Sequence, residues 1–570
     1  MTVLRIGNCS GYFGDRRTAA RELIEGGELD VLTGDYLAET TMLILARQRM
    51  RDASRGYAST FIDHMGDVLG TCLDRGIKVV VNAGGLNPGG CADALGDVAS
   101  AAGLNPSVAV VEGDNLLPEL DRIREAGWTF PRAETGAPIS ELAAPIVAAN
   151  AYLGAWGVVE ALQSDADVVV TGRVTDSALV LGPAAWKFGW ALDDWDRLSA
   201  GIVAGHLIEC STQVSGGNFA FFDEIGSLRH MGMPIVEIDA SGDFVVTKHP
   251  GTGGAVTRET VLAQLLYEIG SPAYLTPDVT AHFDAVCLQD AGTDRVRVTG
   301  ARGSPPPDTL KAIVHYPAGF RNSVEAIIGG GDIDRKVDAF EELFWETAGG
   351  KDAFADTRTD RFVDDKKRCW VRLAARSLDR DHVGRAFSNS AVELVLASVP
   401  GISLAAPPRG ASGCGGVWST TVPRNLVATT VEVAGKKIAH PCPPTLGKPA
   451  PLPAPDRETT TAAHGVPDRL GELCGARSGD KGGDANVGFW VRDPAHYEWM
   501  LSVLTKEWLR ENLPEPFDGA IERYALPNVH SVNFLLRGYL GEGAASSILI
   551  DPQAKFLGEQ LRDAVVPGPV

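Results

Sequence analysis

Five charged or amide side chains and four glycines crowd into the stretch "ARSGDKGGDANVG", residues 476–488. The five are Arg477, Asp480, Lys481, Asp484 and Asn486. A surface turn needs only a glycine and one or two polar residues, so this loop carries more chemistry than turning requires. It is not a P-loop, because Asp480 stands where that motif needs its second glycine and Gly482 follows Lys481. We predict that the loop completes a site with another domain or subunit, where its two cations pair with its two aspartates.

Polar residues also follow the short apolar runs of the first 200 residues. Runs such as "VLRIGN", "IKVVVN" and "DVVVTG" each lead through a glycine loop into a helical pattern, which is typical of parallel α/β structure. Because parallel strands end at one edge of a sheet, we expect the residues that follow them to form a ligand-binding rim. The rim residues are Asn8, Ser10, Asp15, Asp35, Glu39, Asn82, Asn87, Glu112, Asp114, Asn115, Arg173 and Asp176.

Five rim residues carry the predicted acid–base chemistry, and we interpret them as catalytic. They are Asp35, Glu39, Asp114, Arg173 and Asp176. An early helix turn would place Asp35 and Glu39 on one face, where two carboxylates could hold a divalent cation or divide acid and base roles. Arg173 could grip a carboxylate or phosphate with two parallel donors. The structural alternatives are a solvated helix start for the first pair and a helix-capping role for Asp176.

A glycine turn follows the apolar run in "FVVTKHPGTGGAVTRETV". Its glycines would let backbone N–H groups approach an anion at the start of the next helix. It departs from the dinucleotide fingerprint, because Val256 occupies the third-glycine position, and a tight turn without a ligand explains it equally well. With four rim residues it supplies the predicted substrate-binding set: Asn8, Ser10, Asn82, Asn87, Lys248, Gly251, Gly253 and Gly254.

Composition and missing motifs narrow the class of protein. The formal net charge of −21 argues against binding to nucleic acid or to an anionic membrane surface. The sequence has no HExxH, GxSxG, Walker A or H-x-H motif, which disfavours simple zinc hydrolases, serine hydrolases and P-loop NTPases. The first residues lack a signal-peptide pattern, which predicts a cytoplasmic protein. The apolar stretch 143–162 reads as a buried helix, and His206 and Cys210 read better as buried structural residues than as a nucleophile pair.

The fold class that these patterns predict is α/β, with a doubly wound, mostly parallel sheet in the N-terminal part. A mixed α/β region follows in the middle, and a small α+β domain ends the chain. We expect a first region at 1–440 with a division near 200–245, a proline-rich linker at 441–466, and a domain at 467–570.

These motifs, in this order, resemble the acyclic terpene utilisation AtuA family. The resemblance rests on "RIGNCSGYFGD", "LTGDYLAE", "NAGGLNP", "VEGDN", "TGRVTDSALVLG" and "KHPGTGGAVTRETV". The stretch "ARSGDKGGDANVG" is similar to the signature of the family's ferredoxin-like module, here fused behind the linker. The resemblance implies degradation of acyclic terpene or branched acids as CoA thioesters, with a lyase or hydrolase step such as cleavage of a 3-hydroxy-3-isohexenylglutaryl-CoA. It also implies a ferredoxin-like fold for the last domain and an acyl-CoA carboxylase as a pathway partner.

Two classes of function follow from these patterns. The first is an enzyme for a small-molecule acyl-CoA substrate, predicted to be a homo-oligomer, whose cofactor is open and whose carboxylates could take a divalent metal. The second is a non-catalytic partner or scaffold subunit for another enzyme of the pathway, with 476–488 as a docking surface. Convergence of Asp35, Asp114, Arg173 and Asp176 in one pocket favours the enzyme, whereas a shallow rim with the loop at a subunit interface favours the partner.

Overall fold

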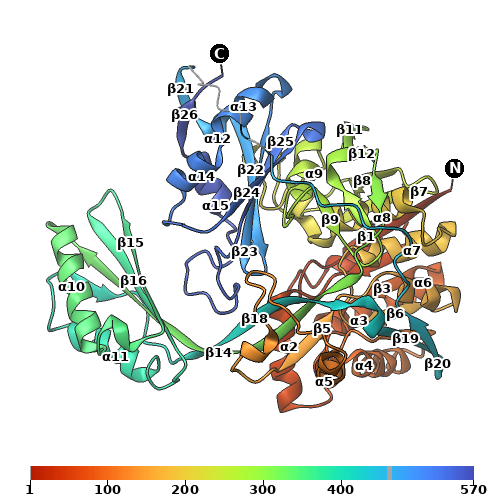
Figure 1. Ribbon diagram of the computed structural model, residues 1–570, viewed down its shortest axis with the longest axis horizontal. Helices are drawn as coiled ribbons and strands as arrows, with labels where there is room; N and C mark the ends of the chain where they lie inside the picture. Colours follow the sequence, from red (N-terminus) through yellow and green to blue (C-terminus); the bar gives the residue numbers. More distant parts are fainter. Residues whose placement is uncertain (1, 457, 459–464, 570) are drawn as a thin grey trace.

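The computed structural model describes residues 2–456, 458 and 465–569, which form a large α/β body, an outlying lobe and a C-terminal domain (Figure 1). The large body contains the N-terminus and lies on the right in Figure 1, and the lobe lies on the left. The C-terminal domain stands between them and contacts both. Within the described residues, no helix is long and apolar enough to cross a membrane.

An 11-stranded sheet organises the large body, in the order β11-β12-β8-β7-β1-β2-β3-β6-β4-β19-β20. Its centre is parallel: β1 (Val3–Asn8), β2 (Val31–Gly34), β3 (Lys78–Val81), β6 (Val168–Thr171) and β4 (Val108–Glu112). The flanks are antiparallel: β7 (Pro234–Asp239), β8 (Phe244–Lys248), β11 (Cys287–Asp290), β12 (Arg295–Thr299), β19 (Ala428–Val433) and β20 (Lys436–Pro441). The predicted mostly parallel, doubly wound sheet is therefore not confirmed, because the flanking strands come as hairpins, whose short turns force antiparallel pairing.

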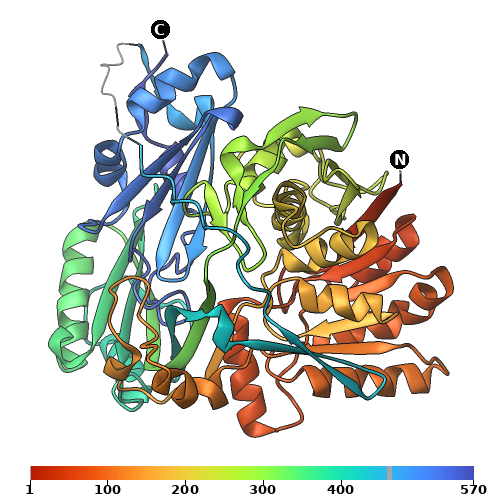
Figure 2. The ribbon, with the colours of Figure 1, turned by 45° about the vertical axis from the view of Figure 1, so that its right-hand side comes forward.

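Helices cover both faces of this sheet (Figure 2). One face carries α1 (Ala19–Gly26), α3 (Ser59–Arg75) and α4 (Pro88–Ala101), and the other carries α6 (Trp156–Gln163), α7 (Ala178–Phe188) and α8 (Trp195–Glu209). Alternate valines of β3 and β6 enter the two cores, with Val79 on one side and Val80 on the other. Burial on both faces explains why these strands read as continuous apolar runs.

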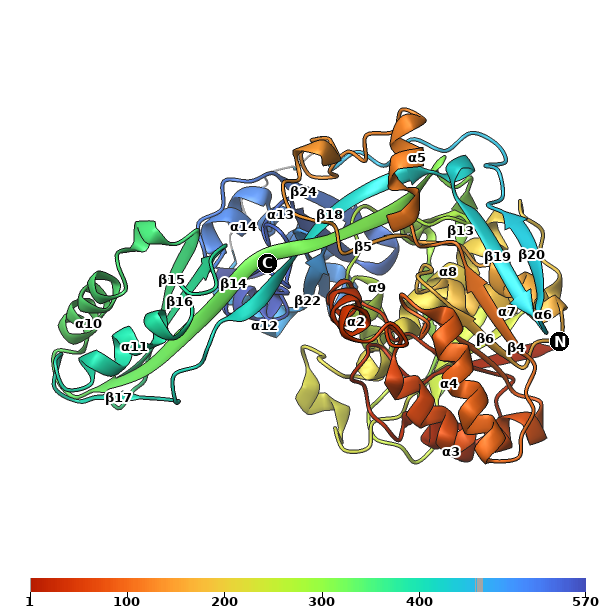
Figure 3. The ribbon, with the colours of Figure 1, turned by 90° about the horizontal axis from the view of Figure 1, so that it is seen from below.

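The lobe is built on β14 (Thr309–Gly329), a 21-residue strand that runs out of the large body (Figure 3). Its first half pairs with β5 (Ala148–Ala151) and β18 (Ser412–Pro423). Its second half pairs with β16 (Arg368–Ser377) and β17 (Ile402–Leu404), and β15 (Asp356–Val363), α10 (Ile333–Thr347) and α11 (Arg385–Leu394) complete the lobe. The single buried helix predicted at 143–162 is wrong, because β5 pairs with a strand 160 residues further along and the helix α6 starts after it.

The C-terminal domain has a four-stranded antiparallel sheet in the order β22-β23-β25-β24. Its elements are β22 (Cys474–Lys481), β23 (Asp484–Val491), α13 (Tyr497–Val503), α14 (Lys506–Asn512), β24 (Ile521–Leu526), β25 (Ser531–Leu536) and α15 (Leu557–Arg562). The charged stretch 476–488 is not the loop that the sequence predicted. Its residues pair with one another in β22 and β23, and the turn is only Gly482 and Gly483, where Gly482 has φ of +65° and so suits a two-residue hairpin.

Short elements complete the chain. They are α2 (Glu39–Arg51), α5 (Leu120–Glu125), α9 (Arg258–Leu265), β9 (Ala273–Leu275), β10 (Thr280–His282), β13 (Arg302–Ser304), β21 (Pro467–Arg469), α12 (Leu470–Leu473) and β26 (Val565–Pro567). The large sheet runs across the division expected near 200–245, since β7 and β8 join β1. Residues 442–456 of the predicted linker contain no helix or strand, whereas 457 and 459–464 lie outside the described residues.

Candidate functional site

The carboxyl ends of the parallel strands bring Asp35 and Asn82 together. Asp35 follows β2 and accepts a hydrogen bond at 2.6 Å from Nδ2 of Asn82, which follows β3. The side-chain oxygen of Asn82 accepts from the Tyr36 N–H at 2.7 Å, so this amide fixes the loop that carries Asp35. Burial, reinforced by the nearby Asp176 carboxylate, raises the pKa of Asp35 well above its ordinary value.

Asp114, after β4, holds the loop that carries Arg173. Its Oδ2 accepts from the Arg173 N–H at 2.9 Å and from Nδ2 of Asn150 at 2.7 Å. A Cβ on Gly172 would lie 2.3 Å from Oδ1 of Asp114, so a side chain there would displace the carboxylate. Burial raises the pKa of Asp114 to about 6. Asp114 thus binds the backbone N–H of Arg173, and Asp114 itself is almost fully buried.

Arg173, after β6, presents its guanidinium to Asp176 and to the ring of Tyr152. Nη1 lies 2.6 Å from Oδ1 of Asp176, and Cζ lies 4.2 Å from the centre of the Tyr152 ring. The Arg173 side chain is 5% exposed and that of Asp176 is 27% exposed, so the carboxylate keeps an accessible side. Helix capping was the structural alternative for Asp176, but its side chain forms an ion pair with Arg173, three residues earlier.

A second cation reaches the same place from β14. Lys311 Nζ lies 3.3 Å from Oε1 of Glu39 and 4.6 Å from the centre of the Tyr152 ring, which therefore contacts two cations. His315, on the same face of β14, has Nε2 3.1 Å from the Glu39 carbonyl oxygen. Burial alone would raise the pKa of Glu39, but Lys311 and His315 lower it. The charged partner of Glu39 is thus Lys311, and Glu39 does not form the predicted pair with Asp35.

Two further carboxylates, Glu209 and Glu268, join the site from the ends of α8 and α9. Burial, together with the Asp176 charge, raises the pKa of Glu209 well above its ordinary value. Burial also raises the pKa of Glu268, to about 7, although Lys481 opposes the shift. His206 faces Glu209, with Nδ1 3.1 Å from Oε1 of that residue, and it packs against aromatic rings.

The C-terminal domain adds Lys481 from the end of β22. Its Nζ donates to the Glu268 carbonyl oxygen at 2.7 Å and lies 5.0 Å from the centre of the Tyr274 ring. Burial and the nearby Lys311 charge lower the pKa of Lys481 to about 8. Two groups from different domains therefore titrate close to neutral pH at one place: the Glu268 carboxyl and the Lys481 ammonium.

These side chains form one polar cluster between the large body and the C-terminal domain. We define the polar cluster as Asp35, Glu39, Arg173, Asp176, Glu209, Glu268, Lys311, Asp480 and Lys481. Some members keep accessible surface: 46% of the Lys311 side chain, 36% of Glu268 and 20% of Glu39. Buried polar atoms beside them have no hydrogen-bond partner among the described residues: Arg173 Nε, His315 Nδ1 and Glu209 Oε2. Such atoms are suited to binding a ligand.

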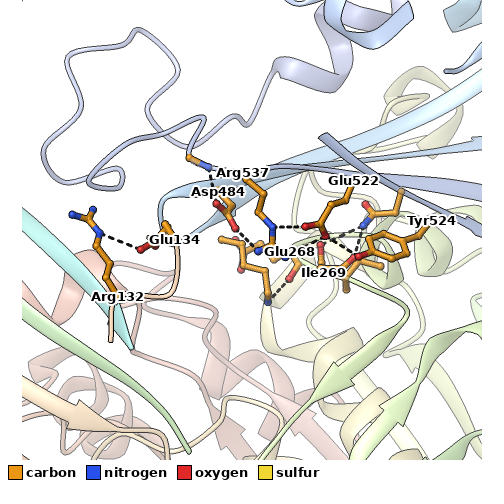
Figure 4. Close-up of polar contacts among 12 residues, drawn as sticks. Arg132, Glu134, Glu268, Ile269, Asp484, Glu522, Tyr524 and Arg537 are labelled. Carbon is orange, nitrogen blue, oxygen red and sulfur yellow. Dashed lines mark hydrogen bonds and ion pairs between the residues drawn. The ribbon is translucent and has the colours of Figure 1, made fainter. Parts of the chain in front are cut away.

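Asp480 and Asp484 bind cations outside the hairpin. Asp480 Oδ1 lies 3.8 Å from Nζ of Lys555. Asp484 accepts from Arg537 Nη1 at 2.8 Å and from a backbone N–H, and Figure 4 shows this contact beside Glu268. The ion pairs predicted within the stretch are therefore wrong. Lys481 and Asp484 stand opposite each other in the hairpin, but Lys481 donates to the Glu268 carbonyl oxygen and Asp484 accepts from Arg537.

The glycines of the hairpin let it lie against the large body. A Cβ on Gly479 would be 2.4 Å from the Tyr267 ring, and one on Gly488 would be 2.8 Å from Cβ of Leu266. Between them, Asn486 donates to the Leu266 carbonyl oxygen at 2.8 Å and accepts from the Glu268 N–H at 2.9 Å. The stretch thus packs against the large body, and that it completes a functional site there stays a prediction.

The turn predicted to bind an anion has its amides occupied. The N–H of Gly253 donates to the His230 carbonyl oxygen, and that of Gly254 donates to the Ser227 carbonyl oxygen. Lys248 Nζ lies 2.9 Å from Oδ2 of Asp294. Gly251 has φ of +77°, as a tight turn requires. This geometry supports the plain turn, so we leave these residues out of the proposed site.

The other predicted substrate-binding residues form hydrogen bonds with backbone groups. Asn8 Nδ2 donates to the Ile208 carbonyl oxygen at 2.7 Å and so fixes the end of α8. Ser10 Oγ donates to the Tyr12 carbonyl oxygen, and Asn87 caps the start of α4. Among the residues that the structure describes, no group of three or more His, Cys, Asp or Glu side chains is arranged to hold a metal ion.

The comparisons with known proteins agree with this architecture. A family model described as acyclic terpene utilisation family protein AtuA matches residues 4–433, and one described as AtuA ferredoxin-like domain matches 469–567. The chain therefore belongs to the AtuA family and carries its ferredoxin-like domain at the C-terminus. No curated protein and no solved structure matches the chain.

Proposed function

We propose that this chain is an enzyme that acts on an acyl-CoA thioester in the utilisation of acyclic terpene or branched acids. We further propose that it is a lyase for a 3-hydroxy-3-isohexenylglutaryl-CoA type of substrate. The observation that supports the proposal is the polar cluster, where Arg173, Lys311 and Glu268 of the large body meet Lys481 of the C-terminal domain. Family membership supports the pathway, and the cluster supports proton-transfer chemistry.

The two cations beside Tyr152 would bind the substrate's oxygens. A 3-hydroxyglutaryl thioester carries a carboxylate and a thioester carbonyl, and both attract positive charge. Arg173 is held by Asp176 and Lys311 by Glu39, so each cation is already oriented. Asp114 and Asn82 act as positioning residues, because they bind the backbone or the carboxylate behind this surface.

Cleavage of such a substrate needs one base and one acid. Glu268 would accept the proton of the 3-hydroxyl group as the hydroxyl oxygen forms a carbonyl and the adjacent carbon–carbon bond breaks. The electron pair of that bond would pass to the acetyl fragment as an enolate, which the Lys481 ammonium would stabilise and protonate. The proton on Glu268 then replaces the one that Lys481 gave, so the pair returns to its starting state.

The direct test is to incubate the purified chain with branched 3-hydroxyglutaryl-CoA thioesters and to identify the products by mass spectrometry. We expect cleavage, and we expect Arg173→Ala and Asp176→Ala to lower turnover by about 10²-fold, because the first removes a cation that binds the substrate and the second removes the carboxylate that orients it. Asp194→Ala and Arg197→Ala provide the matched control, since that pair has the same three-residue spacing on the surface. If none of these thioesters is cleaved, the lyase proposal is wrong, and the role of a non-catalytic partner is favoured.

A second test is the pH dependence of kcat/KM. Glu268 must be deprotonated to act as base, and its pKa is raised to about 7. Lys481 must be protonated to act as acid, and its pKa is lowered to about 8. We therefore expect a bell-shaped profile with its maximum between these values, and loss of the acidic limb in Glu268→Gln. A profile that is flat across this range would contradict these assignments.

A further inference from the structure

A cavity of about 470 Å³ lies beside the polar cluster, at the boundary between the two domains. The segment 216–228 of the large body forms one wall, and β22 and α15 of the C-terminal domain form the other. The side chains that decide its chemistry are Phe219, Phe222, Leu228, Arg477, Lys555 and Glu559. Its volume is in the range typical of small-molecule sites.

One side of the cavity is apolar. Phe219 is buried and stacks on Trp490 of the C-terminal domain, with ring centres 6.2 Å apart. Phe222 and Leu228 are 62% and 51% exposed. Exposed apolar side chains that line a cavity can bury an apolar part of a ligand.

The other side carries a buried cation that has no carboxylate partner among the described residues. Arg477 is 6% exposed, and its donors reach neutral acceptors: the Gln213 side-chain oxygen and the Asn218 carbonyl. Its guanidinium lies 4.4 Å from the centre of the Tyr267 ring. A buried charge without an opposite charge is costly, so an anionic ligand at this wall would be stabilised.

Lys555, which lines the cavity, also contacts the polar cluster. Its Nζ lies 3.6 Å from Oε1 of Glu268 and 3.8 Å from Oδ1 of Asp480, and 4.4 Å from the centre of the Tyr267 ring. Arg477 and Lys555 therefore share one aromatic ring. A ligand bound at Arg477 would have its other end close to Glu268.

We propose that this cavity is a binding subsite for an organic anion, whose negative group pairs with Arg477 and whose apolar body lies against Phe219, Phe222 and Leu228. Two parts of an acyl-CoA offer this chemistry: a branched carboxylate chain, and the phosphates with the adenine ring. That the ligand extends into the polar cluster rests on the proposed function, whereas binding of an anion in the cavity does not.

Calorimetry on the full chain tests the subsite with three probes: coenzyme A, 3,7-dimethyloctanoate and the neutral alcohol 3,7-dimethyloctan-1-ol. We expect one of the two anions to bind at a single site and the alcohol to bind more weakly than the acid. Binding of coenzyme A alone assigns the phosphate end, and binding of the acid alone assigns the branched chain. Absence of binding by both anions, or equal affinity for acid and alcohol in the case where the acid binds, would overturn the proposal.

Two variants locate the bound probe. Arg477→Met should weaken binding roughly 10- to 100-fold, as expected for loss of a charged hydrogen bond. Arg492→Met is the matched control, because Arg492 also lies over an aromatic ring at this boundary, that of Phe221, but pairs with Glu224 and Glu259. Should Arg477→Met unfold, Leu228→Trp fills the mouth of the cavity from an exposed position, and it should also weaken binding.

The outcomes for the two proposals are separable. If anion binding depends on Arg477 but no thioester is cleaved, the subsite proposal is supported and the lyase proposal is contradicted. Cleavage with unchanged probe affinity in Arg477→Met and Leu228→Trp keeps the lyase and removes the subsite.

Discussion

We expect replacement of Lys481 with methionine to lower kcat by about 10⁴-fold while the chain remains folded. The expected loss combines a missing proton donor with a missing cation beside the developing enolate, each of which commonly contributes two or more orders of magnitude. The ammonium donates to the backbone carbonyl oxygen of Glu268 at 2.7 Å, so the hairpin brings it to the residue whose side chain is the proposed base. Steady-state kinetics on a 3-hydroxyglutaryl thioester measures the effect, which should appear in kcat more than in KM.

The control for Lys481→Met is Lys437→Met, a lysine on the surface hairpin of β19 and β20 whose side chain is 64% exposed. Lys481→Arg separates the two roles, because arginine keeps the charge but does not release a proton near neutral pH. We expect it to recover part of kcat and to lose the alkaline limb near pH 8. An unchanged kcat in folded Lys481→Met would end the assignment of Lys481 as acid.

The thermal stability of Lys481→Met should not fall with its activity. Burial lowers the pKa of Lys481 from 10.5 to about 8, so the unfolded chain binds the proton more tightly than the folded one. The contribution of Lys481 to the free energy of unfolding therefore rises as pH increases from about 8 to above 10. Below pH 8 the ammonium is charged in both states, and the full cost of burying its charge remains. Methionine removes a buried charge, so thermal unfolding at pH 7 should not occur at a lower temperature.

The sequence contains local information about part of the polar cluster. Asp35, Arg173 and Asp176 each follow a parallel strand within a few residues, so strand prediction alone places them at one edge. Lys311 and His315 are four apart in a strand and so share a face, which was a signal that could have been used. Glu209 and Glu268 gave no such signal, because one ends α8 and the other follows α9, and Glu268 meets Lys481 only through packing of the C-terminal domain.

The hairpin shows why glycines misled the prediction. Four glycines suggested a flexible loop, since glycine permits turns. In the structure only Gly482 has a positive φ within the stretch, whereas Gly479 and Gly488 provide room for Tyr267 and Leu266. A glycine that marks close packing cannot be distinguished from one that marks a turn until the opposite surface is known.

The Asn486 amide is the other position where a single substitution should have a large effect. It is fully buried and makes three hydrogen bonds: to the Leu266 carbonyl oxygen, from the Glu268 N–H and to the Asn533 side-chain oxygen. In Asn486→Ala, these partners would stay buried without a bond, and each such group costs about 1–3 kcal/mol. We expect the free energy of unfolding to fall by roughly 3–6 kcal/mol, because part of each penalty is relieved by local relaxation.

The same substitution should also lower kcat, because Asn486 anchors β23 beside Glu268 and Lys481 stands at the end of the paired strand. Chemical denaturation measures the stability, and kinetics below the transition measures the activity of the folded fraction. Asn512→Ala is the control, since that amide bonds only within an exposed helix end of the same domain. If Asn486→Ala lost stability but the folded fraction kept full kcat, the hairpin would be a structural anchor alone. Loss of both, with Asn512→Ala unchanged, would show that domain docking and proton transfer depend on one contact, as expected when the acid and the base come from different domains.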